Sequence, residues 1–387
     1  MTPASVETAP LRLSLCMIVK NESHNLHRCL SSVCAWVDEM IIVDTGSSDE
    51  TVAIAQQYGA TVDFFAWRDD FGAARNYSIS KASGNWVLIL DADEELTGDA
   101  AAFRSQIESS RDILAFAIDR VDLVPSQYAS NMVGGFHVRL FQNIPGFQYR
   151  GRYHEQLVYE GDRPKQYAQL TGAQILHHGN SDEDLVREKT LSRNIPILEQ
   201  IRCEEGLSFW LLDCLARNYL SVGQDDAANH CYAEAMDRLL PHLLTGDKPA
   251  DSYWLITMML TLAEGAVDRQ DFETAFLLCQ RGLEWFPNAL PMNYFAGKVL
   301  LNAGFALGAV PYFETCLRLS QTDQFYSVEP FDRGLLHVDP ACALGQAHLE
   351  LQNWEKAEQA FELALAAAPD CELAQQELKA LRQRPRS

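Results

Sequence analysis

The residues of this 387-residue chain best suited to bind a cation are four carboxylates that directly follow an apolar run. Residues 88–90 precede Asp91, Asp93, Glu94 and Glu95, and no lysine or arginine stands nearby. Helix caps or solvated loop charges explain such acids poorly, because one helix start cannot use four of them. A divalent cation would offset their repulsion, and Mg²⁺ or Mn²⁺ held there would bridge to a diphosphate.

Four short β-rich runs, roughly 22 to 26 residues apart, organise the first 90 residues. They are residues 13–19, 39–43, 61–65 and 86–90. A strand, a helix and two short loops use this length, so the spacing predicts βαβ units in a parallel sheet. Ligands of such sheets bind at the carboxyl ends of the strands. The polar stretches "KNE" (20–22) and "DTGSSD" (44–49) are therefore expected at the same edge as the four carboxylates.

Two of the segments between these runs carry helix signals. Ser47 and Glu50 form a capping-box pattern ahead of a helix that should end at Gly59. The stretch 71–84 reads as a second helix, closed in the same way by Gly84. Both helices would connect neighbouring parallel strands.

The pattern loosens in the middle of the chain, which we expect to complete the same domain. Further strands are predicted at residues 113–120, 136–141 and 174–178, separated by turns that contain glycine and proline. Residues 181–202 then read as helical. Pro196 in the middle of that segment predicts a kink or a break.

The last part of the chain has the pattern of a helical repeat. Residues 343–369 show the small-residue and aromatic spacing of a tetratricopeptide unit. Weaker copies surround Ala227, Ala275 and Ala309. The successive intervals between these three alanines and Ala357 are 48, 34 and 48 residues. The surplus over a 34-residue period falls in two loop-like stretches, 241–252 and 321–334. An irregular helical bundle is the alternative.

Composition narrows the class of protein. With 31 Lys and Arg against 53 Asp and Glu, the net charge of −22 argues against a nucleic-acid partner. Ten cysteines without a C-x-x-C pair indicate a reducing compartment, so a cytoplasmic location is expected. The apolar run 13–19 is too short to span a membrane, and no membrane attachment is expected.

Residues 16–60, followed by 71–96, resemble the family 2 glycosyltransferases of GT-A fold. The resemblance covers residues 12–96 well and 137–178 more loosely, and it combines the D-x-D motif at 91–93 with "VDTGSSD" and "KNE". It implies an α/β class with a Rossmann-like GT-A (nucleotide-diphospho-sugar transferase) domain, followed here by an all-α tetratricopeptide-repeat domain. The expected boundaries are 1–180 for the transferase domain, 181–205 for a helical linker and 206–387 for the repeats.

The same resemblance implies roles for the motif residues. Asp93 would be a direct ligand of Mn²⁺ or Mg²⁺, and Asp91 would contact the ribose or share the metal. Asp44 would hydrogen-bond the nucleoside, and Asn21 and Glu22 would line its pocket. A helix-capping role is the alternative for Glu22.

Basic residues and a second acidic motif complete the expected site. Arg75 and Asn76, in "GAARN", match positions that approach the base or the diphosphate, although Arg75 also fits an exposed helix position. In "YRGRYHEQL" (149–157), His154 would complete the metal shell or serve as a structural histidine. Glu155 is the candidate catalytic base, with Glu94 and Glu95 as rivals.

Two further groups are ambiguous in the sequence. Arg139 and Arg152 would neutralise phosphate charge or balance nearby acids. The doublet in "HHG" (177–179) would touch ligand on the acceptor side or pack within the domain.

The predicted activity is an inverting, metal-dependent transfer of a sugar from a nucleoside-diphosphate donor, UDP- before GDP-, to a peptide or protein. Resemblance to bacterial peptide- and protein-modifying transferases, one group of which glycosylates a cysteine of a bacteriocin precursor, implies the protein acceptor and a possible homodimer through the repeats. The alternatives are a glycan or lipid acceptor, and a catalytically idle scaffold that recruits a protein partner. A nucleotidyltransferase is disfavoured because "KNESHN" lacks the glycines of a phosphate loop.

Overall fold

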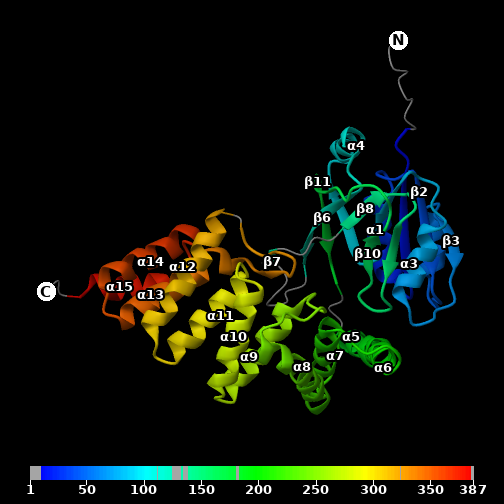
Figure 1. Cartoon of the computed structure of the whole chain (residues 1–387). Helices are drawn as coiled ribbons and strands as arrows, with labels where there is room; N and C mark the ends of the chain where they lie inside the picture. Colours follow the sequence, from blue (N-terminus) through cyan, green and yellow to red (C-terminus); the bar gives the residue numbers. More distant parts are fainter. Residues whose placement is uncertain are drawn as a thin grey trace, which may run out of the picture. The chain divides into compact units, whose positions relative to one another are not determined.

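The computed structural model describes residues 10–110, 112–123, 132–133, 138–179, 183–322 and 324–384. The chain forms two compact units (Figure 1). The first contains the described residues up to 123 together with 138–205, and the second contains 132–133 together with 206–384. The segment expected as a linker, described from residue 183 to 205, thus belongs to the first unit.

An eight-stranded sheet, in the order β3-β2-β1-β4-β8-β6-β11-β5, forms the centre of the first unit. Its strands are β1 (Leu13–Val19), β2 (Glu39–Asp44), β3 (Thr61–Phe64), β4 (Trp86–Ile89), β5 (Glu94–Gly98), β6 (Ala115–Asp122), β8 (Val138–Gln142) and β11 (Tyr167–His177). The predicted parallel sheet is confirmed for the first four strands, because β1 pairs in parallel with β2 and β4, and β2 with β3. Strand β8 is antiparallel to β4 and β6, so the whole sheet is mixed. Residues 136–137 of the predicted strand 136–141 lie outside the described residues.

Helices cover both faces of this sheet, and the apolar composition of β1 requires this. Helices α1 (Ser23–Val33), α2 (Thr51–Gln57), α3 (Phe71–Ile79) and α4 (Ala100–Ser109) belong to the first unit. Leu15 and Met17 of β1 share a core with Leu30 of α1, whereas Cys16 packs on the other face with Tyr77 of α3. A strand buried on both faces is apolar throughout instead of alternating with polar residues.

Two helix boundaries differ from the predictions. Helix α2 begins at Thr51, and the Asp49 carboxylate accepts its first N–H at 3.0 Å, so the capping box of Ser47 and Glu50 is wrong. The Ser47 hydroxyl instead accepts the N–H of Asn21 at 2.9 Å. Helix α3 ends at Ile79, well before Gly84. Gly84 is needed for close packing, since a Cβ there would lie 2.6 Å from the carbonyl oxygen of Arg12.

A continuous helical segment closes the first unit. It comprises α5 (Glu183–Lys189), the π-helical turn η1 (Thr190–Asn194) and α6 (Ile195–Glu204). Pro196 lacks the N–H that an α-helical hydrogen bond to residue 192 needs, and the π turn directly precedes it. The predicted disturbance at Pro196 is therefore a change of helical register.

The second unit is a series of helical hairpins. Its helices are α7 (Phe209–Ser221), α8 (Asp225–Thr245), α9 (Leu255–Asp268), α10 (Phe272–Trp285), α11 (Leu290–Asn302), α12 (Ala306–Thr322), α13 (Val338–Glu350), α14 (Trp354–Ala367) and α15 (Glu372–Arg382). The fourth residue of α8, α10, α12 and α14 is a fully buried alanine. In α8 this residue is Ala228, so the predicted Ala227 is displaced by one position. Helix α8 also extends into the stretch predicted as the loop 241–252.

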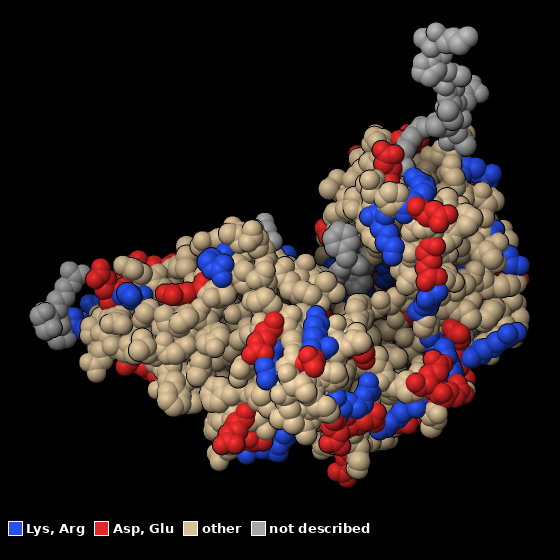
Figure 2. Space-filling view, viewed as in Figure 1, with Lys and Arg blue, Asp and Glu red and all other residues tan. Residues whose placement is uncertain are grey.

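Short elements complete the second unit. Strand β12 (Phe331–Asp332) pairs with β7 (Met132–Val133), and the 3₁₀ turn η2 (Arg333–Leu336) follows. Figure 2 shows acidic and basic side chains intermixed on its visible face. One such pair, Arg281 with Glu284, joins neighbouring turns of α10. In the described part of the chain, no helix is both long enough and apolar enough to cross a membrane.

Two helical glycines of the second unit give a matched test of its packing. A Cβ at Gly345 of α13 would lie 2.6 Å from the buried ring of Phe361. One at Gly308 of α12 would have its nearest neighbours, in Leu300 and Phe305, at ordinary contact distances of 3.8 to 4.0 Å. We expect Gly345→Ala to lower the free energy of unfolding by about 1–3 kcal/mol through overpacking. Gly308→Ala should raise it by about 0.5–1 kcal/mol. Urea unfolding followed by far-UV circular dichroism measures both, and equal effects would contradict the packing described.

Candidate active site

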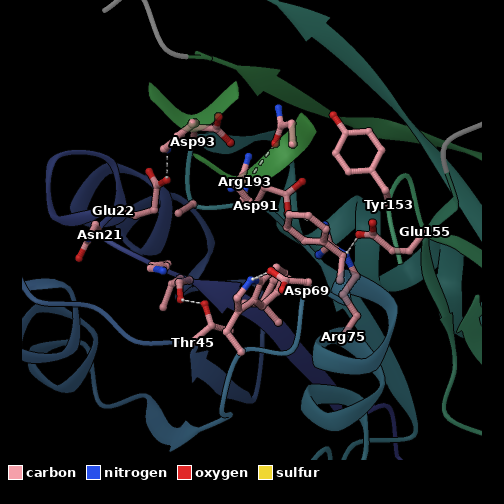
Figure 3. Close-up of a pocket in the computed structure, with 18 of the residues that line it drawn as sticks. Asn21, Glu22, Thr45, Asp69, Arg75, Asp91, Asp93, Tyr153, Glu155 and Arg193 are labelled. Atoms are coloured by element: carbon pink, nitrogen blue, oxygen red, sulfur yellow. Dashed lines mark hydrogen bonds and ion pairs between the residues drawn. The ribbon is translucent and has the colours of Figure 1, made fainter. Parts of the chain in front are cut away.

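A cavity of about 830 Å³ opens in the first unit at the carboxyl ends of the parallel strands. Its wall includes the last two residues of β1 and residues 20–22 after it, Thr45 after β2 and residues 91–93 after β4 (Figure 3). Residues 153–155 and the α5–η1 segment contribute the remaining parts named below. The three polar stretches expected at one sheet edge do meet there.

Seven of the ten predicted site residues line this cavity. They are Asn21, Glu22, Arg75, Asp91, Asp93, His154 and Glu155. The other three, Asp44, Asn76 and Arg152, make protein contacts outside the lining.

Those three contacts have structural consequences. The buried carboxylate of Asp44 accepts the N–H groups of Gly46 and Ser47, both at 3.0 Å, and so shapes the turn that presents Thr45. Asn76 exchanges two hydrogen bonds with the backbone of Tyr149, at 2.7 and 2.8 Å. This joins α3 to β9 (Phe147–Arg150), which pairs with β10 (Gln156–Tyr159).

Arg152 is likewise directed at protein atoms. Its Nε donates to the Asp69 carbonyl at 3.2 Å, and its Nη1 lies 2.7 Å from Oε2 of Glu204 in α6. The pair with Glu204 fits the alternative in which Arg152 balances a nearby acid, and the binding roles expected for Asn76 and Arg152 stay predictions. The expected nucleoside contact of Asp44 stays a prediction.

A network of two arginines and three acids forms the wall at the tip of β4, with Glu94 fully buried and the side chain of Asp91 36% exposed. Arg75 of α3 donates to Asp91 Oδ1 at 2.8 Å and also pairs with Glu155. Arg139 of β8 donates to Glu94 Oε1 at 2.6 Å, and its Nη1 lies 3.5 Å from Asp91 Oδ2. The acids that seemed uncompensated in the sequence therefore have cations supplied from distant segments.

The network fixes the ionisation of its members. Burial opposes the charge of Asp91, but Arg75 and Arg139 outweigh it and hold the pKa of this carboxyl well below its usual range. Burial raises the pKa of Glu94, although Arg139 opposes this. The side chain of Glu94 is 1% exposed and also accepts the N–H of Asp91 at 2.9 Å. Glu94 is thus a structural group instead of an accessible base.

Asp93 contacts a histidine that the sequence analysis did not assign to the metal. Nε2 of His177 lies 3.3 Å from Asp93 Oδ2, and its Nδ1 lies 2.5 Å from Asp122 Oδ1. The hydrogen bond with Asp93 raises the pKa of His177. The next residue, His178, bonds Glu95 at 2.9 Å. Of the "HHG" doublet, His177 lines the cavity, so the ligand-side alternative fits it better than packing alone.

His154 occupies another position on the cavity wall. Its φ of 50° is left-handed, and burial lowers the pKa of its imidazole. Within the described ranges, no three His, Cys, Asp or Glu side chains form a group that could hold a metal ion. The predicted set of Asp91, Asp93 and His154 is therefore not preassembled.

The cavity also contains residues that sequence reasoning missed. Trp67 and Asp69 stand just before the "GAARN" motif, and the Trp67 indole N–H donates to Asp69 Oδ1 at 2.8 Å. Lys189 and Arg193 come from the α5–η1 segment. Lys189 Nζ lies 3.0 Å from Oε1 of Glu22. The sequence feature that could have indicated these two residues is the density of basic residues in "REKTLSRN" (187–194) within an acidic chain.

The charge network predicts a large penalty for removing one cation. Arg139→Met would leave the buried Glu94 unpaired, and we expect a loss of about 3–5 kcal/mol in the free energy of unfolding. The double variant Arg139→Met/Glu94→Gln should recover most of this loss. As a control, Arg150→Met breaks a pair with Glu160 whose two side chains are 57% and 50% exposed, and should cost less than about 1 kcal/mol. Urea unfolding measures the three changes; equal losses for Arg139→Met and Arg150→Met would refute the network's role.

Comparison with known proteins identifies the two parts of the chain. Residues 14–156 match the family described as glycosyl transferase family 2, and residues 339–371 match a tetratricopeptide repeat. The predicted GT-A-type transferase domain and repeat region are thereby confirmed. The match to the transferase family ends before α5.

Three curated proteins illustrate the similarity. A TPR repeat-containing protein of Synechococcus elongatus is 36% identical over 53% of this chain, which spans 49% of that protein. The SPbeta prophage-derived glycosyltransferase SunS of Bacillus subtilis is 25% identical over 88% of this chain and 77% of its own length. An uncharacterised glycosyltransferase of Rickettsia felis is 42% identical over 22% of this chain and 30% of its own length. The chain therefore carries a glycosyl transferase family 2 domain, followed by a region with a tetratricopeptide repeat.

Proposed function

We propose that this chain is an inverting, metal-dependent glycosyltransferase that uses a nucleoside-diphosphate sugar, UDP- before GDP-, and a peptide or protein acceptor. The observation that carries the proposal is the position of Asp93 at the tip of β4, inside an 830 Å³ cavity and beside His177. The family 2 match at residues 14–156 supports the reaction class.

The donor set fits a hard divalent cation that is completed by its ligand. Mg²⁺ and similar ions commonly use one or two carboxylates, and take their other ligands from waters and substrate phosphates. Asp93 and His177 would hold such an ion, and Asp122 would orient the imidazole from its other nitrogen, a common arrangement for metal-binding histidines. The ion would supply charge stabilisation for the leaving diphosphate. We thus assign to His177 the role first expected for His154.

Asp91 and Arg75 would contribute to the site through their ion pair, which holds a hydrogen-bond donor at the cavity wall. Because both of its oxygens face arginines, Asp91 stays ionised and keeps Arg75 against the cavity wall. Nη1 of Arg75 is buried and has no hydrogen-bond partner among the described residues, which leaves an unused donor at this wall. A donor oxygen or a bound water would satisfy it.

The transfer itself is a single displacement. The acceptor's oxygen, sulfur or nitrogen attacks the anomeric carbon as the bond from that carbon to the phosphate oxygen breaks. The electron pair leaves with the nucleoside diphosphate, and the acceptor's proton passes to a base. Attack opposite the leaving group inverts the anomeric centre.

Glu155, first expected as that base, is better suited to positioning. Its Oε1 is paired with Arg75, and protonation would weaken this ion pair. The carboxylate therefore orients Arg75 and, through it, Asp91.

The second unit supports the choice of acceptor. Stacked helical hairpins form extended surfaces suited to polypeptides, which favours a peptide or protein over a glycan or lipid.

Donor turnover tests the reaction class. We expect the protein with Mn²⁺ to release UDP or GDP slowly from the matching sugar donors, and Asp93→Ala to lower that rate by about 10²-fold. Asp162→Asn, an exposed acid outside the cavity lining, should leave it unchanged. If no donor binds or turns over, and Asp93→Ala is silent, the scaffold alternative is favoured instead.

The metal has its own prediction. EDTA should weaken binding of the donor diphosphate by at least about tenfold in the wild type, and His177→Ala should reduce the affinity for Mn²⁺ by about 10–100-fold. Titration calorimetry with Mn²⁺ and UDP measures both effects. Identical affinities with and without chelator would remove Asp93 and His177 from these roles.

Glu155→Gln separates positioning from base catalysis. For positioning, the donor KM should rise and UDP affinity should fall, because Arg75 loses a charged partner. For a base, kcat would drop by about 10²–10⁴-fold with UDP affinity retained. Steady-state kinetics and UDP titration of this variant decide between the two outcomes.

A further inference from the structure

We propose that Arg193, on the π-helical turn η1, binds the diphosphate of the sugar donor directly and independently of the metal. The inference rests on the proposed function and adds a residue that holds the leaving group. Arg193 lies beyond residues 14–156, so the family match assigns it no role.

Arg193 reaches the cavity without an ion-pair partner among the described residues. It lines the cavity, and in Figure 3 it lies on the side opposite Thr45. Its Nε donates to Asn194 Oδ1 at 3.0 Å, and its guanidinium carbon sits 5.2 Å from the ring centre of Phe71. Among the described residues, no carboxylate lies within ion-pair distance of it.

Two other cations of the cavity wall are already balanced, whereas a third, Lys20, is an exposed lysine. Arg75 forms ion pairs with Asp91 and Glu155, and Lys189 forms one with Glu22. Arg193 thus keeps both terminal nitrogens for a ligand.

The acidic lining of the cavity is the reason that a cation at Arg193 would matter for binding. Six acids line the cavity: Glu22, Asp69, Asp91, Asp93, Glu155 and Glu188. A diphosphate entering such a wall meets repulsion that one divalent ion offsets only in part. The planar guanidinium offers two parallel N–H donors that match phosphate oxygens, which a lysine ammonium cannot do.

Local structure holds Arg193 in place. The π turn widens the helix just before Pro196, and the Thr190 hydroxyl donates to the Val186 carbonyl at 2.9 Å. Phe71 fixes the guanidinium plane from one side. Burial lowers the pKa of Arg193, with Tyr153, Glu22 and Glu155 opposing, and an arginine remains charged even so. Partial removal from water strengthens its attraction to an anion.

Nucleotide binding in the absence of metal tests the inference. Titrations with UDP, UMP, GDP and GMP are done in EDTA and again with Mn²⁺. We expect Arg193→Gln to weaken the binding of the preferred diphosphate in EDTA by about tenfold, the effect of one lost charged hydrogen bond. The monophosphate should change less, so the preference for diphosphate over monophosphate should shrink, and Arg193→Lys should fall between wild type and Arg193→Gln.

The matched control is Arg187→Gln. Arg187 is exposed on α5, six positions earlier, and does not line the cavity, so this variant should bind like the wild type. Circular dichroism and the melting temperature check that each variant is folded. If the wild type binds UDP or GDP and Arg193→Gln binds it equally in EDTA, the inference is overturned and the proposed function stands. If the wild type binds neither nucleotide under any condition, the proposed function fails first.

Discussion

The candidate site depends on one arrangement of charge, in which two arginines hold three acids. Arg75 comes from α3 and Arg139 from β8. Asp91 follows β4, Glu94 begins β5, and Glu155 precedes β10. Each ionised side chain is stabilised by partners of opposite charge. Removal of one side chain leaves its partner ionised without a counter-charge, which destabilises the fold. Folding of the first unit therefore assembles the cavity wall at the same time, since the ion pairs join strands and helices that are far apart in the sequence.

This arrangement divides the D-x-D motif between two tasks. Asp91 faces Arg75 and Arg139 and is part of the wall, while Asp93 faces His177 and the cavity. The repulsion expected for clustered acids disappears because neighbouring carboxylates point to different partners. It also explains why no three ligand side chains converge in the described residues: a cation at Asp93 must take its remaining ligands from a phosphate and from water.

Local patterns predicted the framework well, and contacts between distant segments were beyond them. The parallel strands and helical hairpins follow from short-range periodicity, which a sequence displays directly. The capping box at Ser47 failed because Asp49, two residues later, supplies the oxygen for the first N–H of α2. Arg139 and His177 stand far from residues 91–95 in the chain, so nothing local indicated that they contact Glu94 and Asp93.

Electrostatics also connects the α5–η1 segment to the family 2 domain that precedes it. The domain presents carboxylates at the edge where a diphosphate must bind, and its own arginines are consumed by the wall. Apart from the exposed Lys20, further positive charge at the cavity comes from outside this domain, either with the ligand, as a metal ion, or from another part of the chain. Arg193 meets that need because Phe71 holds its guanidinium in the cavity while no described acid neutralises it. Metal and arginine would share the charge of the diphosphate, so neither has to offset the acidic wall alone.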